Sequence, residues 1–453
     1  MDILSSVFGF VLAVGILVAF HEYGHFWVAR RLGVKVLRYS IGFGRPLLRW
    51  HGKRDNTEYV LAAIPLGGYV KMLDEREGEV AEADRPRAFN RQTLPVRTAI
   101  VAAGPLANFL FAAVAYWAIF VIGSTELRPV VGEVRPDSPA AAAGLERGDE
   151  LLRVGGSEVR TWQQALMALL GGGLERGELP LQVAREDGRV AVLTLDLRQT
   201  PALGEDADYL RVLGLEPWLP RLPPELGRIL PDGAAADSDL APGDRVLAVA
   251  GEPVDDWNEL VAAVRARPGE RVDLLIVRNG VQYTRPVTLG VQQLNGESIG
   301  ALGVGPHVPP DLYADMQREV RYGPVAATTQ ALRATWDASA LTLRVLGRMV
   351  IGEASLKNLS GPINIAQYAG DTVSMGLVPF LKFLAIVSIS LGILNLLPVP
   401  ILDGGHLLYF AIEAVRGKPL SEHAQVVGQQ VGILLLVMLM GLAIFNDLAR
   451  LFG

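Results

Sequence analysis

The sequence contains no cysteine among its 453 residues. Disulfide bonds, thiolate zinc sites and cysteine nucleophiles are therefore all excluded. Charged residues are also scarce, at 20%, whereas hydrophobic residues make up 50% of the chain. The formal net charge of −6 gives no basic signature, so a nucleic-acid partner is not expected. This composition is typical of a membrane protein with sizeable soluble parts.

Four apolar segments are long enough to cross a bilayer, which takes about 20 residues. They lie at 3–29, 98–123, 373–397 and 424–446. The first segment follows Asp2 instead of a basic region, and its basic cluster comes after it, so we expect a retained helix and not a cleaved signal peptide. The sequence therefore predicts a polytopic α-helical membrane protein with four transmembrane helices.

The distribution of basic residues predicts the orientation of these helices. Short loops rich in Lys and Arg stay in the cytoplasm. The loop from 30 to 97 carries 14 basic residues, and Arg416 and Lys418 follow the third span. Both termini and the long segment from 126 to about 370 are therefore expected on the outer side.

The outer segment contains an internal duplication. Residues 144–166 align with residues 239–260 at a constant offset of 95 residues. The shared pattern, G-D-x-(L/V)-L-x-V-x-G…W, resembles PDZ domains of the bacterial protease type. We expect α/β PDZ domains at 126–215 and 216–308, which would bind extended peptides or chain ends by adding a strand to a sheet edge. A pair that merely packs over the membrane part is the alternative.

Two further segments have readable patterns. Residues 309–372 place apolar residues at helical spacing between arginines, which predicts an amphipathic helical segment at the membrane interface. Helices packed beneath the outer domains are an equally good interpretation. Residues 57–72 have two apolar runs around Pro65 and Gly67-Gly68, which predicts a β-hairpin. Its apolarity suggests that it dips into the membrane against protein or a water-filled cavity; a surface hairpin is the alternative.

The chemistry is concentrated in the first span, in the motif HEYGH with His21, Glu22 and His25. Ionisable residues within a span indicate function, because lipid penalises them unless something compensates. Positions i and i+4 share one helix face, so both imidazoles can bind one metal beside Glu22. Zinc suits imidazole ligands, and a catalytic zinc site has three protein ligands plus a water molecule. His25 precedes Arg30 by five residues, which places it about 7 Å inside the cytoplasmic edge.

A third ligand is expected from the segment at 394–406, LNLLPVPILDGGH. Asp403 lies at the cytoplasmic end of its span, as does HEYGH, so topology brings both to one depth. Pro398 and Pro400 break the helix and leave room for a cavity. His406 remains a competing ligand, unless it orients Asp403 or faces the cytoplasm.

These motifs together resemble the site-2 protease family of intramembrane metalloproteases. The resemblance rests on HEYGH, on GPLAN at Gly104 to Asn108, and on NLLPVPILDGG in the third span. Further matches are GFGRPL, PLGGYVKM and LSGP. Two outer PDZ domains and four spans narrow the resemblance, which covers essentially the whole chain, to a bacterial branch of the family.

The resemblance implies roles for three groups of residues. One zinc ion would be held by His21, His25 and Asp403, with Glu22 as the general base. The substrate would contact Asn395, Pro398, Gly67, Gly68 and Tyr69, where the 57–72 hairpin pairs with an unwound substrate strand. Close helix packing would be permitted by Gly104 and Asn108.

The resemblance also implies a substrate and a location. The substrate would be the span of a single-span protein such as an anti-sigma factor, already trimmed outside by another protease, in envelope stress signalling. Remnant signal peptides are a second implied class. The PDZ pair would exclude untrimmed chains. The protein would lie in the bacterial inner membrane, with its PDZ domains in the periplasm and its active site near the cytoplasmic side.

Other classes of function fit the sequence less well. A membrane chaperone or receptor that captures peptides with its PDZ pair would need no general base, so Glu22 argues against it. Metal transport through His and Asp is disfavoured by the soluble domains and by the HEYGH spacing. An aspartyl intramembrane protease needs two intramembrane aspartates, and only Asp403 is well placed. A serine type needs a nucleophilic serine in a glycine-rich motif, which we do not find.

Overall fold

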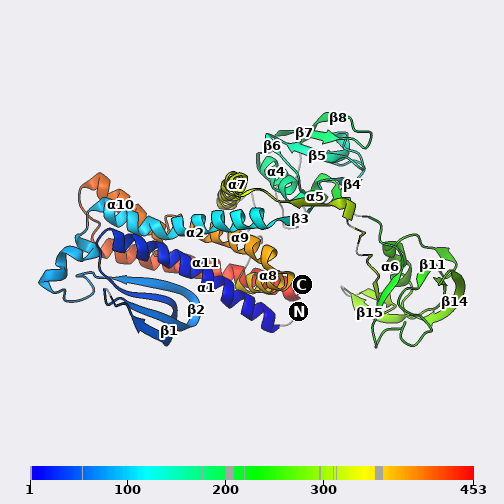
Figure 1. Cartoon of the computed structure of the whole chain (residues 1–453), viewed down its shortest axis with the longest axis horizontal. Coiled ribbons are helices and arrows are strands. Elements are labelled where there is room, and N and C mark those ends of the chain that lie inside the picture. Colours follow the sequence, from blue (N-terminus) through cyan, green and yellow to red (C-terminus); the bar gives the residue numbers. More distant parts are fainter. Residues whose placement is uncertain are drawn as a thin grey trace.

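The computed structural model describes residues 3–452 except 54, 176, 199–208, 219, 295–296, 310, 313 and 352–360. Within this part of the chain, four helices are long and apolar enough to cross a membrane. They are α1 (Ile3–Arg31), α2 (Leu94–Ile122), α9 (Leu377–Leu396) and α11 (Glu422–Phe452), and they run along one common direction in Figure 1. The structure thus agrees with the prediction of four membrane-spanning helices.

Small residues let these helices approach closely. A Cβ atom on Gly24 of α1 would lie 2.3 Å from the carbonyl oxygen of Ala103 of α2. On the other side of α2, Ser388 of α9 donates a hydrogen bond to the carbonyl oxygen of Asn108 at 2.9 Å. Such close contacts between small residues are how membrane helices associate without a hydrophobic driving force. As a result, the HEYGH helix packs directly against the GPLAN helix.

The third span is shorter than predicted. Two helices, α8 (Pro362–Met375) and α9, replace the continuous helix expected at 373–397. They meet at Gly376, whose φ of 114° is a conformation that glycine adopts at little steric cost. The apolar run on both sides hid this break. Only α9, with 20 residues, has the length of a span.

The segment at 57–72 does not form a hairpin by itself, so that prediction was wrong in extent. β2 (Glu58–Met72) pairs instead with β1 (Val36–His51). The pairing lays four segments side by side, in the order 46–51, 58–62, 36–41 and 68–72. β1 turns back on itself at Gly42 and Gly44, whose φ angles are 88° and 86°. These glycines interrupt the alternating pattern, which is why the sequence did not reveal β1.

Two units of the same topology follow α2. Each has a four-stranded sheet, β6-β5-β7-β8 or β12-β11-β13-β14, and a two-stranded sheet, β4-β9 or β10-β17. The strands of the first unit are β4 (Val131–Val134), β5 (Glu150–Val154), β6 (Ser157–Glu158), β7 (Glu178–Ala184), β8 (Val190–Asp196) and β9 (Leu215–Pro217). Its helices are α3 (Pro139–Ala142), α4 (Trp162–Glu175) and α5 (Tyr209–Leu213). Because β9 ends at Pro217, this unit passes the boundary predicted at 215.

The second unit repeats this arrangement. Its strands are β10 (Leu226–Ile229), β11 (Arg245–Val249), β12 (Glu252–Pro253), β13 (Arg271–Arg278), β14 (Val281–Thr288), β15 (Gly290–Leu294), β16 (Glu297–Ala301) and β17 (Val304–Pro306), and its helix is α6 (Trp257–Arg265). Each unit has its own buried apolar core. The duplication in the sequence therefore corresponds to two separately packed domains.

A small sheet connects the membrane helices to these units. β3 (Ser124–Leu127) follows α2 and pairs with β18 (Gln317–Val320). Residues 126–127, which the sequence prediction assigned to the first unit, therefore belong to this connecting sheet. Glu150 of that unit accepts hydrogen bonds from Arg128 at 2.5 Å and from Arg318 at 3.1 Å. Lys382 of α9 forms an ion pair with Glu126. The first unit is thus anchored to the helix bundle.

Helix α7 (Pro324–Val350) follows β18 and has two different faces. One face packs on α2 and α9 through Ala338. The other face exposes Leu332, Trp336 and Leu343, and Trp336 is 73% exposed. The helix therefore packs on the bundle and also keeps an apolar face exposed. Its place at the membrane interface stays a prediction.

A buried aspartate in the second unit gives a test of that unit's stability. Burial of Asp244 raises its pKa, but hydrogen bonds from Arg278 at 2.6 and 2.8 Å outweigh this and lower the pKa. A lowered pKa in the folded state means that this carboxylate stabilises the unit above its unfolded pKa and ceases to do so as the pH falls. Asp244→Asn should destabilise the unit by about 2 kcal/mol at pH 7, because it weakens hydrogen bonds made to a charged group.

Hydrogen–deuterium exchange of the detergent-solubilised protein measures this effect. Amides of β11 and β13 should exchange about 30-fold faster in Asp244→Asn. Asp239→Asn is the matched control, since Asp239 is 74% exposed and its ion pair with Arg285 should contribute at most about 1 kcal/mol. Equal exchange in the two variants would contradict the assigned role of Asp244.

Candidate metal centre

The structure brings together the three residues predicted as metal ligands. His21 and His25 lie one turn apart on α1, and Asp403 is the first residue of α10 (Asp403–Arg416). The two Nε2 atoms are 3.3 Å apart, and Asp403 Oδ2 lies 3.2 Å from that of His21 and 3.4 Å from that of His25. Among the described residues this is the one such group of at least three His, Asp or Glu side chains.

The donor set fits a zinc ion. Four-coordinate zinc with bonds of about 2.0–2.1 Å places neighbouring ligand atoms about 3.3 Å apart, which is close to the three distances here. Asp403 Oδ2 is buried and has no hydrogen-bond partner among the described residues. His25 Nδ1 lies 2.9 Å from the carbonyl oxygen of Ile100, so its proton belongs on Nδ1 and its Nε2 lone pair faces the carboxylate. Lone pairs that converge in this way suit a cation between them.

Asn108 orients the second imidazole. Its side-chain nitrogen lies 3.2 Å from His21 Nδ1, while its buried Oδ1 has no partner among the described residues. The two amide atoms are interchangeable by a 180° turn, and their order is assigned from the hydrogen-bond network. After that turn, Oδ1 accepts the Nδ1 proton of His21 and leaves Nε2 free for metal. The sequence predicted only helix packing for Asn108 and missed this contact.

Removing the Asn108 amide should therefore weaken zinc binding. Loss of a group that orients a ligand typically costs 10–100-fold in metal affinity, and we expect a loss of about that size for Asn108→Leu. Competition with a chelator measures the affinity without recourse to activity. Ser388→Ala is the control, because Ser388 bonds the main-chain oxygen of Asn108 and not its side chain. An unchanged zinc affinity in Asn108→Leu would remove Asn108 from the site.

Gly104 makes room for a ligand. A Cβ atom at this position would lie 2.1 Å from His25 Nε2. Gly104 therefore lies next to the three ligand side chains, and its small size leaves room for the His25 ring. Because His25 belongs to α1, Gly104 is also a point of close approach between α1 and α2, and Gly24, inside HEYGH, is a second one. No role was predicted for Gly24 from the sequence, although a glycine inside the HEYGH motif could have indicated close helix packing.

Glu22 lies between the metal group and the sheet. A Cβ atom on Gly68 of β2 would lie 2.9 Å from Glu22 Cγ and 2.8 Å from Val18 Cγ1. The segment at 68–72 pairs with 36–41 on one side, and no described strand pairs with its other edge. The structure thus brings Gly68 beside Glu22, whereas a Cβ atom on Gly67 would lie 2.7 Å from the ring of Phe43. Tyr69 contacts a different part of the sheet, where its hydroxyl accepts a hydrogen bond from Arg38 at 2.9 Å.

The remaining predicted residues lie outside the ligand group. Asn395 is half-buried near the end of α9, and Pro398 is exposed in the turn that follows. His406 is exposed on α10, with its ring edge-on to Tyr409. Asp403, and not the competing candidate His406, is the third member of the ligand group.

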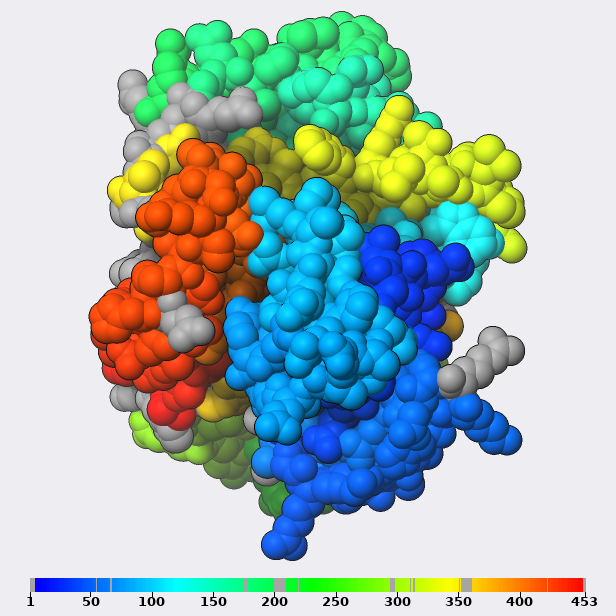
Figure 2. Space-filling model, turned by 90° about the vertical axis from the view of Figure 1, so that its left-hand side faces the viewer, coloured from blue at the N-terminus to red at the C-terminus, as the bar shows by residue number. Residues whose placement is uncertain are grey.

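Several contacts fix the helix that presents Asp403. Arg97 at the start of α2 forms an ion pair with Glu413 of α10 at 2.5 Å, with both side chains largely buried. Its guanidinium also lies 5.0 Å from the centre of the Phe410 ring. Just before α10, Ile401 has a φ of 117°, which costs of order 1–3 kcal/mol in a non-glycine residue. Figure 2 shows α10 and the residues before α2 together on one end of the molecule.

Comparison with known proteins identifies the family of this chain. The family model for peptidase family M50 matches residues 9–439. The regulator of sigma-E protease RseP of Escherichia coli (strain K12) is 44% identical over 453 residues, and the match covers 100% of both chains. The regulator of sigma E protease of Salmonella typhi is also 44% identical, over 452 residues and all of both chains. A putative zinc metalloprotease of Vibrio cholerae is 41% identical over 452 residues, which are 99% of this chain and 100% of that one. The resemblance found in the sequence is thereby confirmed, and the chain is an intramembrane metalloprotease that belongs to peptidase family M50, the site-2 proteases.

Proposed function

We propose that this protease uses one zinc ion, held by His21, His25 and Asp403, to cut a peptide bond inside the membrane span of its substrate. The observation that carries the proposal is the convergence of three ligand atoms from a membrane helix and from the turn after another. Zinc held there would polarise a carbonyl group and make water a nucleophile at neutral pH. It would do so within the depth of the bilayer.

The chain's own residues supply the rest of the chemistry. Glu22 accepts a proton from the attacking water and passes it to the leaving amine, as a general base and then acid. The amide of Asn108 and the carbonyl of Ile100 hold the two imidazoles in the tautomer that leaves Nε2 free. The ion pair of Arg97 with Glu413 keeps α10, and with it Asp403, against α2.

The free edge at 68–72 is suited to hold the substrate. A transmembrane helix keeps its carbonyl groups in internal hydrogen bonds, so it must unwind before attack, and unpaired backbone groups are costly in lipid. An exposed strand edge offers replacement hydrogen bonds. Because Gly68 lies against Glu22, this edge would present the unwound segment to the general base. Asn395 and Pro398 would contact the same segment from the end of α9.

The two outer units act, in this proposal, as periplasmic PDZ domains that admit only trimmed single-span proteins such as an anti-sigma factor. Relatives named as regulators of sigma-E protease support this substrate class. In Figure 1 the units and α10 lie toward opposite ends of the helix bundle. With the basic loops on the cytoplasmic side, α10 and the metal centre would lie near the cytoplasmic side of an inner membrane.

Removing the outer units tests the filter. We would compare the whole protein with a variant lacking residues 129–315, in which β3 and β18 stay joined, on one single-span substrate with and without its outer domain. The whole protein should cleave the trimmed substrate at least about tenfold faster, a difference of about 1.4 kcal/mol. The deletion variant should cleave both forms alike. Unchanged discrimination by that variant would show that the units are not the filter.

A further inference from the structure

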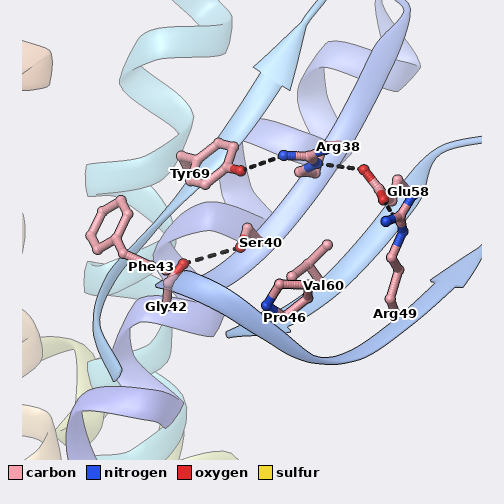
Figure 3. A pocket seen from close by; sticks show the side chains of 10 residues that line it. Arg38, Ser40, Gly42, Phe43, Pro46, Arg49, Glu58, Val60 and Tyr69 are labelled. Atoms are coloured by element: carbon pink, nitrogen blue, oxygen red, sulfur yellow. Dashed lines mark hydrogen bonds and ion pairs between the residues drawn. The ribbon is translucent and has the colours of Figure 1, made fainter. Parts of the chain in front are cut away.

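The sheet of β1 and β2 contains a cavity of about 220 Å³ that the proteolytic chemistry does not use. The cavity lies on the face turned away from α1, since Tyr39 and Tyr59 face α1 and their neighbours along the strands point the other way. Its lining, drawn in Figure 3, includes Arg38, Phe43, Arg49, Glu58 and Tyr69.

The polar side of the cavity carries excess positive charge. Glu58 pairs with both Arg38, at 2.5 Å, and Arg49, so two guanidinium groups share one carboxylate. Their side chains are 41% and 58% exposed. Each guanidinium has five N–H donors, and few of these have partners among the described residues. The free donors and the net charge suit an anion with several oxygen atoms, such as a phosphate.

The other side of the cavity is apolar and continues onto an exposed apolar surface. Phe43 stacks on Tyr69, with ring centres 6.1 Å apart. Phe43 and the adjoining Leu47, which lies on the same face as Arg49, are 43% and 65% exposed. Exposed apolar surface beside charged groups is expected where a protein faces lipid. A ligand that fits both sides has a phosphate attached to hydrocarbon.

The depth of the cavity also fits a lipid headgroup. Phe26 packs edge-on against the rings of Tyr39 and Tyr59, next to Arg38 and Glu58 in the sheet. Phe26 precedes Arg30 by four residues, which is about 6 Å along α1. The paired arginines therefore lie near the basic end of the helix, where the phosphate groups of a bilayer gather.

We propose that this cavity binds the phosphate group of a membrane glycerophospholipid through Arg38 and Arg49, with the acyl chains lying over Phe43 and Leu47. The lipid would hold the sheet, and with it the edge at 68–72, at a fixed depth. This inference does not depend on the substrate proposed above.

Native mass spectrometry of the delipidated whole protein tests the proposal with phosphatidylglycerol as the probe. Arg49→Gln should weaken binding of the lipid by about tenfold or more, as expected for a lost charge-assisted hydrogen bond. Arg49→Lys should keep most of the affinity, which separates loss of the site from misfolding. Arg31→Gln is the matched control, because Arg31 lies on the same basic end of α1 but outside the cavity and over Trp27.

Two further probes identify which part of the lipid is bound. Diacylglycerol lacks the phosphate and should bind equally weakly to the wild type and to Arg49→Gln. Inorganic phosphate lacks the acyl chains and should not displace the lipid at millimolar concentration. Equal losses in Arg49→Gln and Arg31→Gln would indicate general attraction to basic charge and overturn the site. Ready displacement by inorganic phosphate would indicate a free-anion site and overturn the lipid assignment.

Discussion

Glu22→Gln is expected to abolish cleavage and to leave zinc bound. Glutamine keeps the shape of the side chain but cannot accept the proton of the attacking water. General acid–base catalysis contributes about 10²–10⁴-fold to rate, and Glu22 performs both transfers in the proposed mechanism, so a loss near the upper end of that range is expected. The metal ligands are separate residues, with Asp403 and both imidazoles untouched by the change.

The experiment measures two quantities on the same preparation in detergent. The cleavage rate should fall by about 10³-fold or more, while the zinc content should stay equal to that of the wild type. Tyr23→Phe is the control, since Tyr23 is the next residue on α1 and is 51% exposed. A Glu22→Gln variant that retains a tenth or more of the wild-type rate would exclude Glu22 as the general base.

Gly104→Ala is the second change with a large expected effect, although it adds a single methyl group. That methyl carbon would lie 2.1 Å from His25 Nε2, the atom that points into the metal group. His25 would have to turn away and lose its hydrogen bond to Ile100. We expect zinc affinity to fall by more than the roughly 10–100-fold that loss of an orienting residue costs, and cleavage to fall with it.

A matched glycine separates this steric effect from a general effect on the membrane helices. Gly15 lies in α1, and a Cβ atom there would meet nothing within 4 Å. Gly15→Ala should therefore bind zinc normally. Alanine also stabilises a helix by up to about 1 kcal/mol relative to glycine. The same preference applies to Gly104→Ala, so its loss of zinc should occur in a folded, monodisperse protein. Normal zinc affinity in Gly104→Ala would show that the ligand geometry described here is wrong.

The fold was predictable where one local property determines it. Uninterrupted apolar runs identify the four spans because the bilayer requires about 20 such residues. The repeat at a constant offset likewise identified the two outer units. The predictions failed where backbone conformation decides, as at Gly376, which divides the expected third span. They failed again at β1, where Gly42 and Gly44 turn the strand back on itself.

The metal group was predictable for a related reason. The helical spacing of His21 and His25 puts both on one face, and topology alone brings Asp403 to their depth. The roles of Gly104 and Asn108 were not predictable, because they depend on how two helices rotate against each other. Asn108 and His21 are separated by 87 positions in the chain, and no local pattern encodes which atoms of such residues meet.

Identification of the scissile bond tests the central claim most directly. A tagged single-span protein whose outer domain has been removed would be incubated with the purified wild type, and the products would be mapped by mass spectrometry. We predict one cut inside the membrane span, toward its cytoplasmic end, that disappears when zinc is chelated and returns when zinc is restored. Cleavage confined to the loops outside the span, or cleavage that persists without zinc, would contradict an intramembrane metal centre at His21, His25 and Asp403.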